Sequence, residues 1–325
     1  MRITNSQGKS YQRCKRQYDY KYGQLLTPLS VGLPLKRGSW LHELLEADLR
    51  GKDWRKRNAE LTGEFNKLFE EERERYGDLP TICENIMEAY CYHWREERKG
   101  WKILSVEDKY EVELPNGHTL VFKVDGVIED DYGQWLLEHK SHKTIPNDNY
   151  RFIDIQSARY VWGLNKLGWD IQGVIWDYIR TKEPTKPKLL KDGTRLSKAK
   201  MDTDLFTYVS ALKEYGLDPR DYRDVILRLK EHNTFFRRER VPKPPRVIQT
   251  LVNELVDVAD EIEGGYHPTR SIERGCAFSC DYLEVCMTEL YGGDADMVRR
   301  LKYRTATEED YYGLEGLAEG LQVSG

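Results

Sequence analysis

Side chains alternate between apolar and polar over residues 101–140, and this alternation constrains the fold more than any other part of the chain. It predicts strands at 101–114 and 118–128, because successive side chains of a strand point to opposite faces of a sheet. The tripeptide Pro-Asn-Gly between these two runs is typical of a hairpin turn. A third strand is expected at 133–140. The middle of the chain is therefore predicted to be a strand cluster.

Helical periodicity dominates on both sides of the strand cluster. Apolar spacing predicts helices near 10–22, 41–49, 54–76, 80–99, 149–167, 204–215, 219–232 and 244–263. Two further strands are expected near 171–179 and 234–240. This order of elements indicates one α/β domain with helical additions at both ends. We place the domain at 1–294, with its core at about 100–180 and a basic insertion at about 180–203.

Composition excludes several classes of protein. Aromatic residues make up 11% of the 325 residues, too many for a disordered chain, although 295–325 is expected to be an acidic, mobile tail. No apolar run approaches the ~18–20 residues of a membrane span, and the N-terminus lacks the apolar core of a secretory signal. Six cysteines are too few for a disulfide scaffold. A globular protein of the cytoplasm is expected.

Two carboxylates and a lysine come together in the strand cluster. Glu138 and Lys140 lie two positions apart on one expected strand, so they point to the same face of the sheet. The turn before that strand brings Asp125 close to Glu138. Carboxylate oxygens are the ligands that Mg²⁺ and Mn²⁺ prefer, and a lysine beside the metal could orient water or stabilise charge on a phosphate. The alternative is a solvated strand face, since Glu-x-Lys pairs are common in charged proteins.

Three more residues accompany this group at helical spacing. His42 follows Gly38 by four residues on one expected helix, and Gln156 and Tyr160 lie four apart on another, hence on one helix face. A lone helical histidine is more often structural, and a Gln/Tyr pair is usually surface and core. The ordered series G-x-x-x-H, D, E-x-K and Q-x-x-x-Y is much rarer than its parts, so the sequence favours chemistry here.

This series resembles the RecB-like branch of the PD-(D/E)XK nucleases, which includes AddB-type nucleases, CRISPR-associated iron–sulfur exonucleases and many phage exonucleases. The resemblance covers about residues 8–291. It implies a central mixed β-sheet flanked by helices, with N- and C-terminal helical additions joined by a metal-cluster staple. It also implies a Mg²⁺- or Mn²⁺-dependent DNA exonuclease of phage or bacterial recombination, repair or processing. Such hydrolysis needs metal ions to neutralise the phosphodiester and to generate the nucleophile.

The resemblance also implies roles for individual residues. The implied ligands of the divalent metal are His42, Asp125, Glu138 and the main-chain carbonyl of His139. Lys140 would position or help activate the water, and Gln156 and Tyr160 would contact the DNA backbone near the scissile phosphate. The proline of the family name is replaced by Val124 here. Glu46, one helical turn after His42, is expected on a solvated helix face, and contact with the metal shell is the alternative.

The cysteines suggest a second metal site. Three of them fall within eleven residues, namely Cys276, Cys280 and Cys286. Such spacing in a cytosolic protein indicates a metal or cluster, for which four ligands are normally needed. By the resemblance, Cys14 is the fourth ligand of a [4Fe–4S] staple that ties the two ends of the chain together. A four-thiolate zinc site and free thiols are the alternatives. Cys83 and Cys91 have apolar neighbours and are expected to be buried structural thiols.

Phosphate contacts from Lys and Arg would hold the substrate. The best candidate is 180–200, with eight basic residues against two acidic ones. A second basic cluster surrounds Cys14, and Phe235–Arg240 mixes aromatic and basic residues in a pattern suited to single strands. The expected partner is DNA, single-stranded or with an end. The alternative function is a DNA-binding or processing subunit that acts with a helicase, a recombinase or a CRISPR adaptation integrase.

Overall fold

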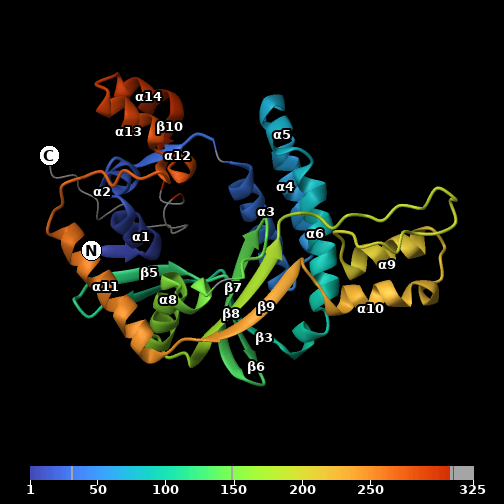
Figure 1. Cartoon of the computed structure of the whole chain (residues 1–325). Helices are drawn as coiled ribbons and strands as arrows, with labels where there is room; N and C mark the ends of the chain where they lie inside the picture. Colours follow the sequence, from blue (N-terminus) through green and yellow to red (C-terminus); the bar gives the residue numbers. More distant parts are fainter. Residues whose placement is uncertain (31, 148, 308–309, 311–325) are drawn as a thin grey trace.

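A five-stranded mixed sheet occupies the middle of the molecule (Figure 1). The computed structural model describes residues 1–30, 32–147, 149–307 and 310. The strands follow the order β3 (Lys102–Val106), β6 (Gly126–Asp130), β7 (Gly133–His142), β8 (Ile171–Arg180) and β9 (Phe236–Pro242). β7 and β8 are parallel, and the other neighbouring pairs are antiparallel. The expected α/β fold with a central mixed sheet is confirmed.

The parallel pair is joined by a helical crossover, as parallel strands require. The crossover contains α7 (Tyr150–Ile153) and α8 (Ile155–Lys166) instead of the single helix expected over 149–167. The helix breaks at Asp154, whose ψ of 124° is not helical. Its carboxylate accepts a hydrogen bond from the backbone N–H of Ser157 at 2.8 Å and so caps the first turn of α8.

A second sheet shares a hairpin with the first. It has the order β1 (Arg2–Thr4), β5 (Thr119–Lys123) and β4 (Lys109–Glu113), with β1 parallel to β5. The strands expected at 101–114 and 118–128 are therefore each broken in two, and the hairpin crosses from one sheet to the other. At the crossing, Glu107 has a positive φ of 53° and its N–H donates to the carbonyl of Asp125 at 3.3 Å. Alternation predicts the strands but not this bend.

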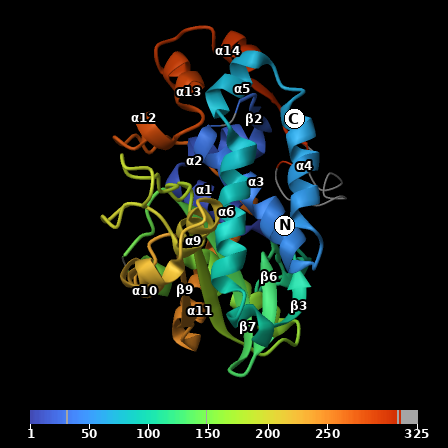
Figure 2. The same ribbon diagram turned by 90° about the vertical axis from the view of Figure 1, so that its right-hand side faces the viewer.

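Helices cover both faces of the five-stranded sheet. On one face lie α3 (Leu33–Leu49) and α6 (Leu79–Trp94), with α4 (Trp54–Phe65) and α5 (Glu70–Tyr76) packed against them, and the 3₁₀ turn Glu97–Gly100 follows α6. Figure 2 shows α6 in front of this face. On the other face lie α1 (Asn5–Arg13), α8 and α11 (Pro245–Glu263). Trp176 and Tyr178 point into the core under α8, whereas Ile175 and Ile179 point to the opposite side.

A small lobe separates β8 from β9 and lies at the right of Figure 1. It starts with the basic segment, in which Leu189 and Leu196 form an isolated β-bridge. It continues with α9 (Leu205–Glu214), the 3₁₀ turn Pro219–Tyr222 and α10 (Arg223–Glu231). The lobe has its own apolar cluster, which includes the fully buried Tyr208 and Leu212.

The N-terminal and C-terminal segments meet beyond the sheet. The N-terminal segment contains α2 (Lys15–Tyr18), the π-helical turn Asp19–Gly23 and β2 (Leu26–Pro28), and the C-terminal segment contains α12 (Cys276–Ser279), α13 (Leu283–Leu290), α14 (Ala295–Lys302) and β10 (Tyr303–Thr305). β2 and β10 form an antiparallel pair. The expected tail is therefore wrong for 295–305, because Val298 and Tyr303 pack against the N-terminal segment. Residues 311–325 lie outside the described residues.

Membrane-spanning helices were not expected from the sequence. Within the described part of the chain, none of the helices has both the length and the apolar character that a span requires.

Candidate active site

Asp125 lies at the junction of the two sheets, directly before β6. Its Oδ2 accepts a hydrogen bond from the backbone N–H of His139 at 2.7 Å. Because Gly126 pairs with Leu137, Asp125 stands beside Glu138 on the neighbouring strand. The structure thus brings Asp125 next to the Glu-x-Lys sequence.

Glu138 and Lys140 point to the same face of β7, toward α8. Lys140 Nζ donates to Glu138 Oε2 at 2.7 Å. The Glu138 side chain is 2% exposed, and burial raises its pKa to about 7 even though Lys140 acts in the opposite direction. Burial also disfavours the charge of Lys140, yet the neighbouring carboxylates raise its pKa. Near neutral pH, Lys140 is therefore protonated while Glu138 is poised to gain or lose a proton.

His42 reaches this group from α3. Its Nδ1 lies 3.7 Å from Asp125 Oδ1. Burial lowers the pKa of His42, which favours the neutral imidazole that binds metals. Burial also opposes the charge of Asp125, but the charge of His42, when that imidazole is protonated, and the charge of Lys140 lower the pKa of Asp125. The pair therefore offers one imidazole nitrogen and one ionised carboxylate.

Glu107 joins His42 and Asp125, although the sequence analysis missed it. Ligand atoms of these three residues all lie within 4.8 Å of one another, so one cation could contact all three. Glu107 is paired with Lys123, and burial raises its pKa to about 6. Several other acidic residues lie close to Glu107 in the sequence. Only the bend between β3 and β4, which the sequence does not reveal, separates Glu107 from these neighbours and turns it toward the site.

A cavity of 630 Å³ opens over these residues. His42, Glu107 and Asp125 line it together with Glu46, which also receives a hydrogen bond from Arg50 at 2.8 Å. Glu46 was expected on a solvated helix face. The structure places it at the edge of this acidic cavity with a partly exposed side chain, which agrees with that expectation and leaves contact with the metal shell as the alternative.

The side chain of His139 points away from Glu138 and Lys140. Its Nδ1 lies 3.0 Å from Oδ2 of the fully buried Asp177, which also pairs with Arg238 at 3.0 Å and accepts from Tyr90 at 2.5 Å. The main chain of His139 contacts Asp125 directly, whereas its imidazole lies between Asp177 and the ring of His42, whose centroid is 6.2 Å away. The buried ion pair behind β7 fixes that stretch of main chain.

Gln156 and Tyr160 lie on α8 above Glu138. Tyr160 is buried, stacks on Phe122 with ring centroids 5.0 Å apart, and is hydrogen-bonded to Gln156. Burial and then the nearby Glu138 raise the pKa of Tyr160. The structure therefore brings the Q-x-x-x-Y pair to the same site as the Glu-x-Lys pair.

Two further lysines approach the site from distant parts of the sequence. Lys9 on α1 lies 3.8 Å from the Asp154 carboxylate, and burial lowers its pKa. Lys243 donates to the carbonyl of Arg151 at 2.8 Å, and burial lowers its pKa to about 8. No local pattern marks either lysine, since only the packing of α1 against α8 and of the end of β9 against α7 brings them here.

Four cysteines line one cavity of 90 Å³ between the two ends of the chain, namely Cys14, Cys276, Cys280 and Cys286. Ser271 connects two of them: its N–H donates to Cys14 Sγ at 3.5 Å, and its carbonyl accepts from Cys276 Sγ at 3.8 Å. Cys83 is fully buried, as expected, whereas Cys91 is only partly buried. Burial raises the pKa of each of these two thiols to about 12.

The structure supports the predicted DNA-contact segments to different degrees. In 180–200, five of the eight basic residues pair with carboxylates, namely Arg180, Lys182, Lys186, Arg195 and Lys198. Among the described residues, Lys188, Lys191 and Lys200 have no carboxylate within 4 Å. The interpretation of Phe235–Arg240 as a single-strand platform is wrong, because Phe235 and Phe236 are buried in the core.

Three basic residues around Cys14 also bind to other side chains of the protein. Lys15 pairs with Glu261 at 3.2 Å, and Arg16 pairs with Glu289 at 2.5 Å. Arg13 donates to the hydroxyl of Ser279 at 2.7 Å. This cluster therefore holds the chain ends together.

The comparisons with known proteins fit this geometry. The model of the PD-(D/E)XK nuclease superfamily matches residues 2–287. The chain belongs to the PD-(D/E)XK nuclease superfamily. Membership in this superfamily indicates a metal-dependent nuclease and implies DNA as its substrate.

Similarity to individual proteins is weaker than the superfamily match. None of the curated proteins matches the sequence. A solved structure, "Crystal structure of SSO0001", is 12% identical with a TM-score of 0.33, over 88% of this chain and 85% of that chain. The assignment of this PD-(D/E)XK nuclease to its superfamily rests on the superfamily match.

Proposed function

We propose that this nuclease is a DNA exonuclease that uses Mg²⁺ or Mn²⁺ bound by His42, Asp125, Glu138 and the main-chain carbonyl of His139. The convergence of Asp125, Glu138 and Lys140 at the junction of the two sheets carries the proposal. One imidazole and two carboxylates are a donor set that suits these cations. The bound cation would neutralise the phosphodiester and supply a nucleophilic water.

Lys140 acts as a donor in this proposal. Its neighbours Glu138 and Asp125 raise its pKa, so it keeps its proton near neutral pH. It therefore orients the attacking water or a phosphate oxygen through its ammonium protons. Gln156 and Tyr160 approach from α8 and hold the DNA backbone on the same side of β7.

The exonuclease mode is inferred from two features found together. The Q-x-x-x-Y pair and the four-cysteine set are combined in the RecB-like exonucleases that this sequence resembles, whereas restriction-type relatives usually lack both. The two features share no residues, so each supports the proposal separately. The enzyme would then hydrolyse DNA starting from its ends.

The four cysteines are proposed to bind a [4Fe–4S] cluster. Four thiols face one cavity, which is also lined by the apolar Leu283 and Met287. Such a donor set fits a cluster, and it equally fits a zinc ion. Either group would supply a cross-link between Cys14 and the C-terminal segment.

One preparation tests both parts of the proposal. The protein is purified without oxygen, and iron, sulfide and zinc are measured per chain. End-labelled linear DNA and covalently closed circular DNA are then incubated with Mg²⁺ or Mn²⁺. The proposal expects loss of linear DNA from its ends and survival of the circle. Equal cleavage of both substrates would show an endonuclease, and zinc without sulfide would replace the cluster.

A further inference from the structure

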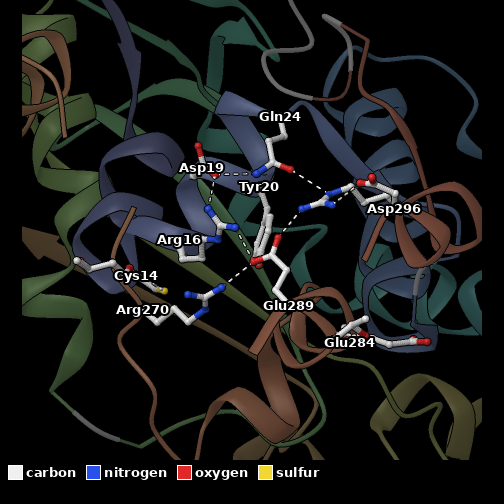
Figure 3. Close-up of polar contacts among 12 residues, drawn as sticks. Cys14, Arg16, Asp19, Tyr20, Gln24, Arg270, Glu284, Glu289 and Asp296 are labelled. Carbon is white, nitrogen blue, oxygen red and sulfur yellow. Dashed lines mark hydrogen bonds and ion pairs between the residues drawn. The ribbon is translucent and has the colours of Figure 1, made fainter. Parts of the chain in front are cut away.

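Glu289 on α13 collects hydrogen bonds from both ends of the chain (Figure 3). Its Oε2 accepts from Arg16 at 2.5 Å, from the hydroxyl of Tyr20 at 2.6 Å and from Arg270 at 2.7 Å. Its Oε1 accepts from Arg299 of α14. The Glu289 side chain is only 13% exposed. We call these five residues the Glu289 hub.

The hub connects the N-terminal cysteine to the C-terminal ones. Arg16 follows Cys14 by two residues, and Glu289 lies one helical turn after Cys286 on α13. The ion pair between Arg16 and Glu289 therefore fixes the distance between the segments that carry Cys14 and Cys286. Charge-assisted hydrogen bonds of this kind are roughly twice as strong as neutral ones.

The other two cysteines are held by neighbouring bonds. Arg270 donates to Glu289 and directly precedes Ser271, which contacts both Cys14 and Cys276. On the other side of Cys14, Arg13 donates to Ser279, the residue before Cys280. Each of the four cysteines therefore has, at or near its own position, a polar contact that does not involve a metal.

We propose that the Glu289 hub preassembles the four-cysteine site, so that Cys14 stands beside the other three thiols before any metal or cluster binds. This inference rests on the proposed role of the four thiols as metal ligands. In proteins without such support, metal binding and folding of the site are one event. The four bonds to Glu289 form between side chains of the protein itself and do not require a bound metal, and preorganisation of this kind increases affinity.

The first test is a Co²⁺ titration of the metal-free full chain, followed by thiolate-to-cobalt absorption. The variant is Glu289→Gln, which keeps the shape of the side chain and removes its charge. The matched control is Glu284→Gln on the same helix, because Glu284 is exposed and lies 3.6 Å from Lys302 (Figure 3). We expect Glu289→Gln to weaken Co²⁺ binding by about 10- to 100-fold, the range for losing a hydrogen bond to a charged group, and the control to bind like wild type.

The second test does not depend on metal. The metal-free chain is oxidised at low concentration, and disulfides that contain Cys14 are mapped by mass spectrometry of its peptides. Preassembly predicts rapid intramolecular linkage of Cys14 to a C-terminal cysteine in wild type and in Glu284→Gln. The same linkage should be slower in Glu289→Gln.

The outcomes separate this inference from the proposed function. If Glu289→Gln binds Co²⁺ and forms disulfides like wild type, preassembly by the hub is wrong. If wild type forms the disulfides rapidly but binds neither Co²⁺, Zn²⁺ nor iron with sulfide, the thiols are not metal ligands and the proposed cofactor fails. If Glu289→Gln does not fold, Tyr20→Phe is used, since it removes one hydrogen bond and keeps the buried ring; it should weaken Co²⁺ binding in the same direction by a smaller factor.

Discussion

The backbone N–H of His139 donates to one carboxylate oxygen of Asp125, and the other oxygen of Asp125 faces the imidazole of His42. The first contact ties the junction of the two sheets to the middle of β7. The second contact ties the same carboxylate to α3. Asp125 therefore has its orientation set by two different elements, and the site depends on the register of β7 as well as on the identity of its residues.

Replacement of Lys140 or Glu138 by alanine should abolish cleavage and leave DNA binding nearly unchanged. Lys140 positions water or phosphate, and a positioned group of this kind contributes about 10²- to 10⁴-fold to the rate. The Glu138→Ala variant would lack one of the proposed metal ligands. Single-turnover cleavage and filter binding with saturating Mn²⁺ measure the two effects. Wild-type rates in both variants would remove these residues from the active site.

Replacement of Glu107 by glutamine should raise the concentration of Mn²⁺ needed for half-maximal cleavage. Glu107 shares one potential cation position with His42 and Asp125, and loss of a group that supports a metal typically changes affinity by about 10- to 100-fold. Glu43→Gln is the control, because Glu43 lines the same cavity and is also paired with a cation, Arg57, but does not belong to the group of ligand atoms formed by His42, Glu107 and Asp125. Equal Mn²⁺ requirements in both variants would exclude Glu107 from the metal site.

The stability of the metal-free protein should fall as the pH rises from about 4.5 to about 7. The reason is that burial raises the pKa of Glu138 from 4.5 to about 7 in the folded chain, so over this range the folded state binds the proton that the unfolded state has released. Above about pH 7 this contribution is constant. Urea unfolding with a chelator at several pH values measures it, and Glu138→Gln should lack this component. The same pH dependence in the variant would assign it to other groups.

Neutralising the small-lobe lysines that have no carboxylate partner among the described residues should lower the salt dependence of DNA binding. Lys188, Lys191 and Lys200 are available for phosphates, whereas Lys186 is paired with Glu214 at 2.6 Å. Each lost phosphate contact should reduce the log–log salt slope by about 0.7–0.9. The triple alanine variant is compared with Lys186→Ala across a salt series. A slope unchanged from wild type in the triple variant would show that these lysines contact only solvent.

Iron content should separate the six cysteines into two groups. Alanine at Cys14 or at Cys280 should remove the cluster, because both thiols line the same cavity. Alanine at Cys83 or Cys91 should keep the iron and cost about 1 kcal/mol of unfolding free energy, as for loss of a small buried side chain. Iron and sulfide per chain are measured after anaerobic purification. A full cluster in Cys14→Ala would reassign the fourth ligand.

The sequence predicts best what depends on local periodicity. The same-face placement of Glu138 and Lys140 follows from the two-residue period of a strand, and it is confirmed. The convergence of the four cysteines was inferred from a family resemblance, and the structure brings them to one cavity. Glu107 and Lys9 were missed, because their positions follow from a bend between sheets and from the packing of α1, which no local pattern encodes.

The failures have a common physical cause. Phe235–Arg240 has the composition of a nucleic-acid platform, yet its aromatic rings are in the core and Arg238 is buried against Asp177. Likewise, four of the eight basic residues of 180–200 are paired with acids outside that segment, such as Glu214 and Asp224. Charge composition cannot reveal which cations are already neutralised by distant partners.

The pairing of β2 with β10 has a consequence for biosynthesis. Residues Leu26–Pro28 find their partner only when the ribosome has passed Thr305. Every shorter nascent chain lacks part or all of β10 and exposes the edge of β2, so the last step of folding waits for translation of nearly the entire described sequence. Contacts this distant along the chain form slowly. Truncated products of interrupted translation should therefore be recognised by proteases as incomplete.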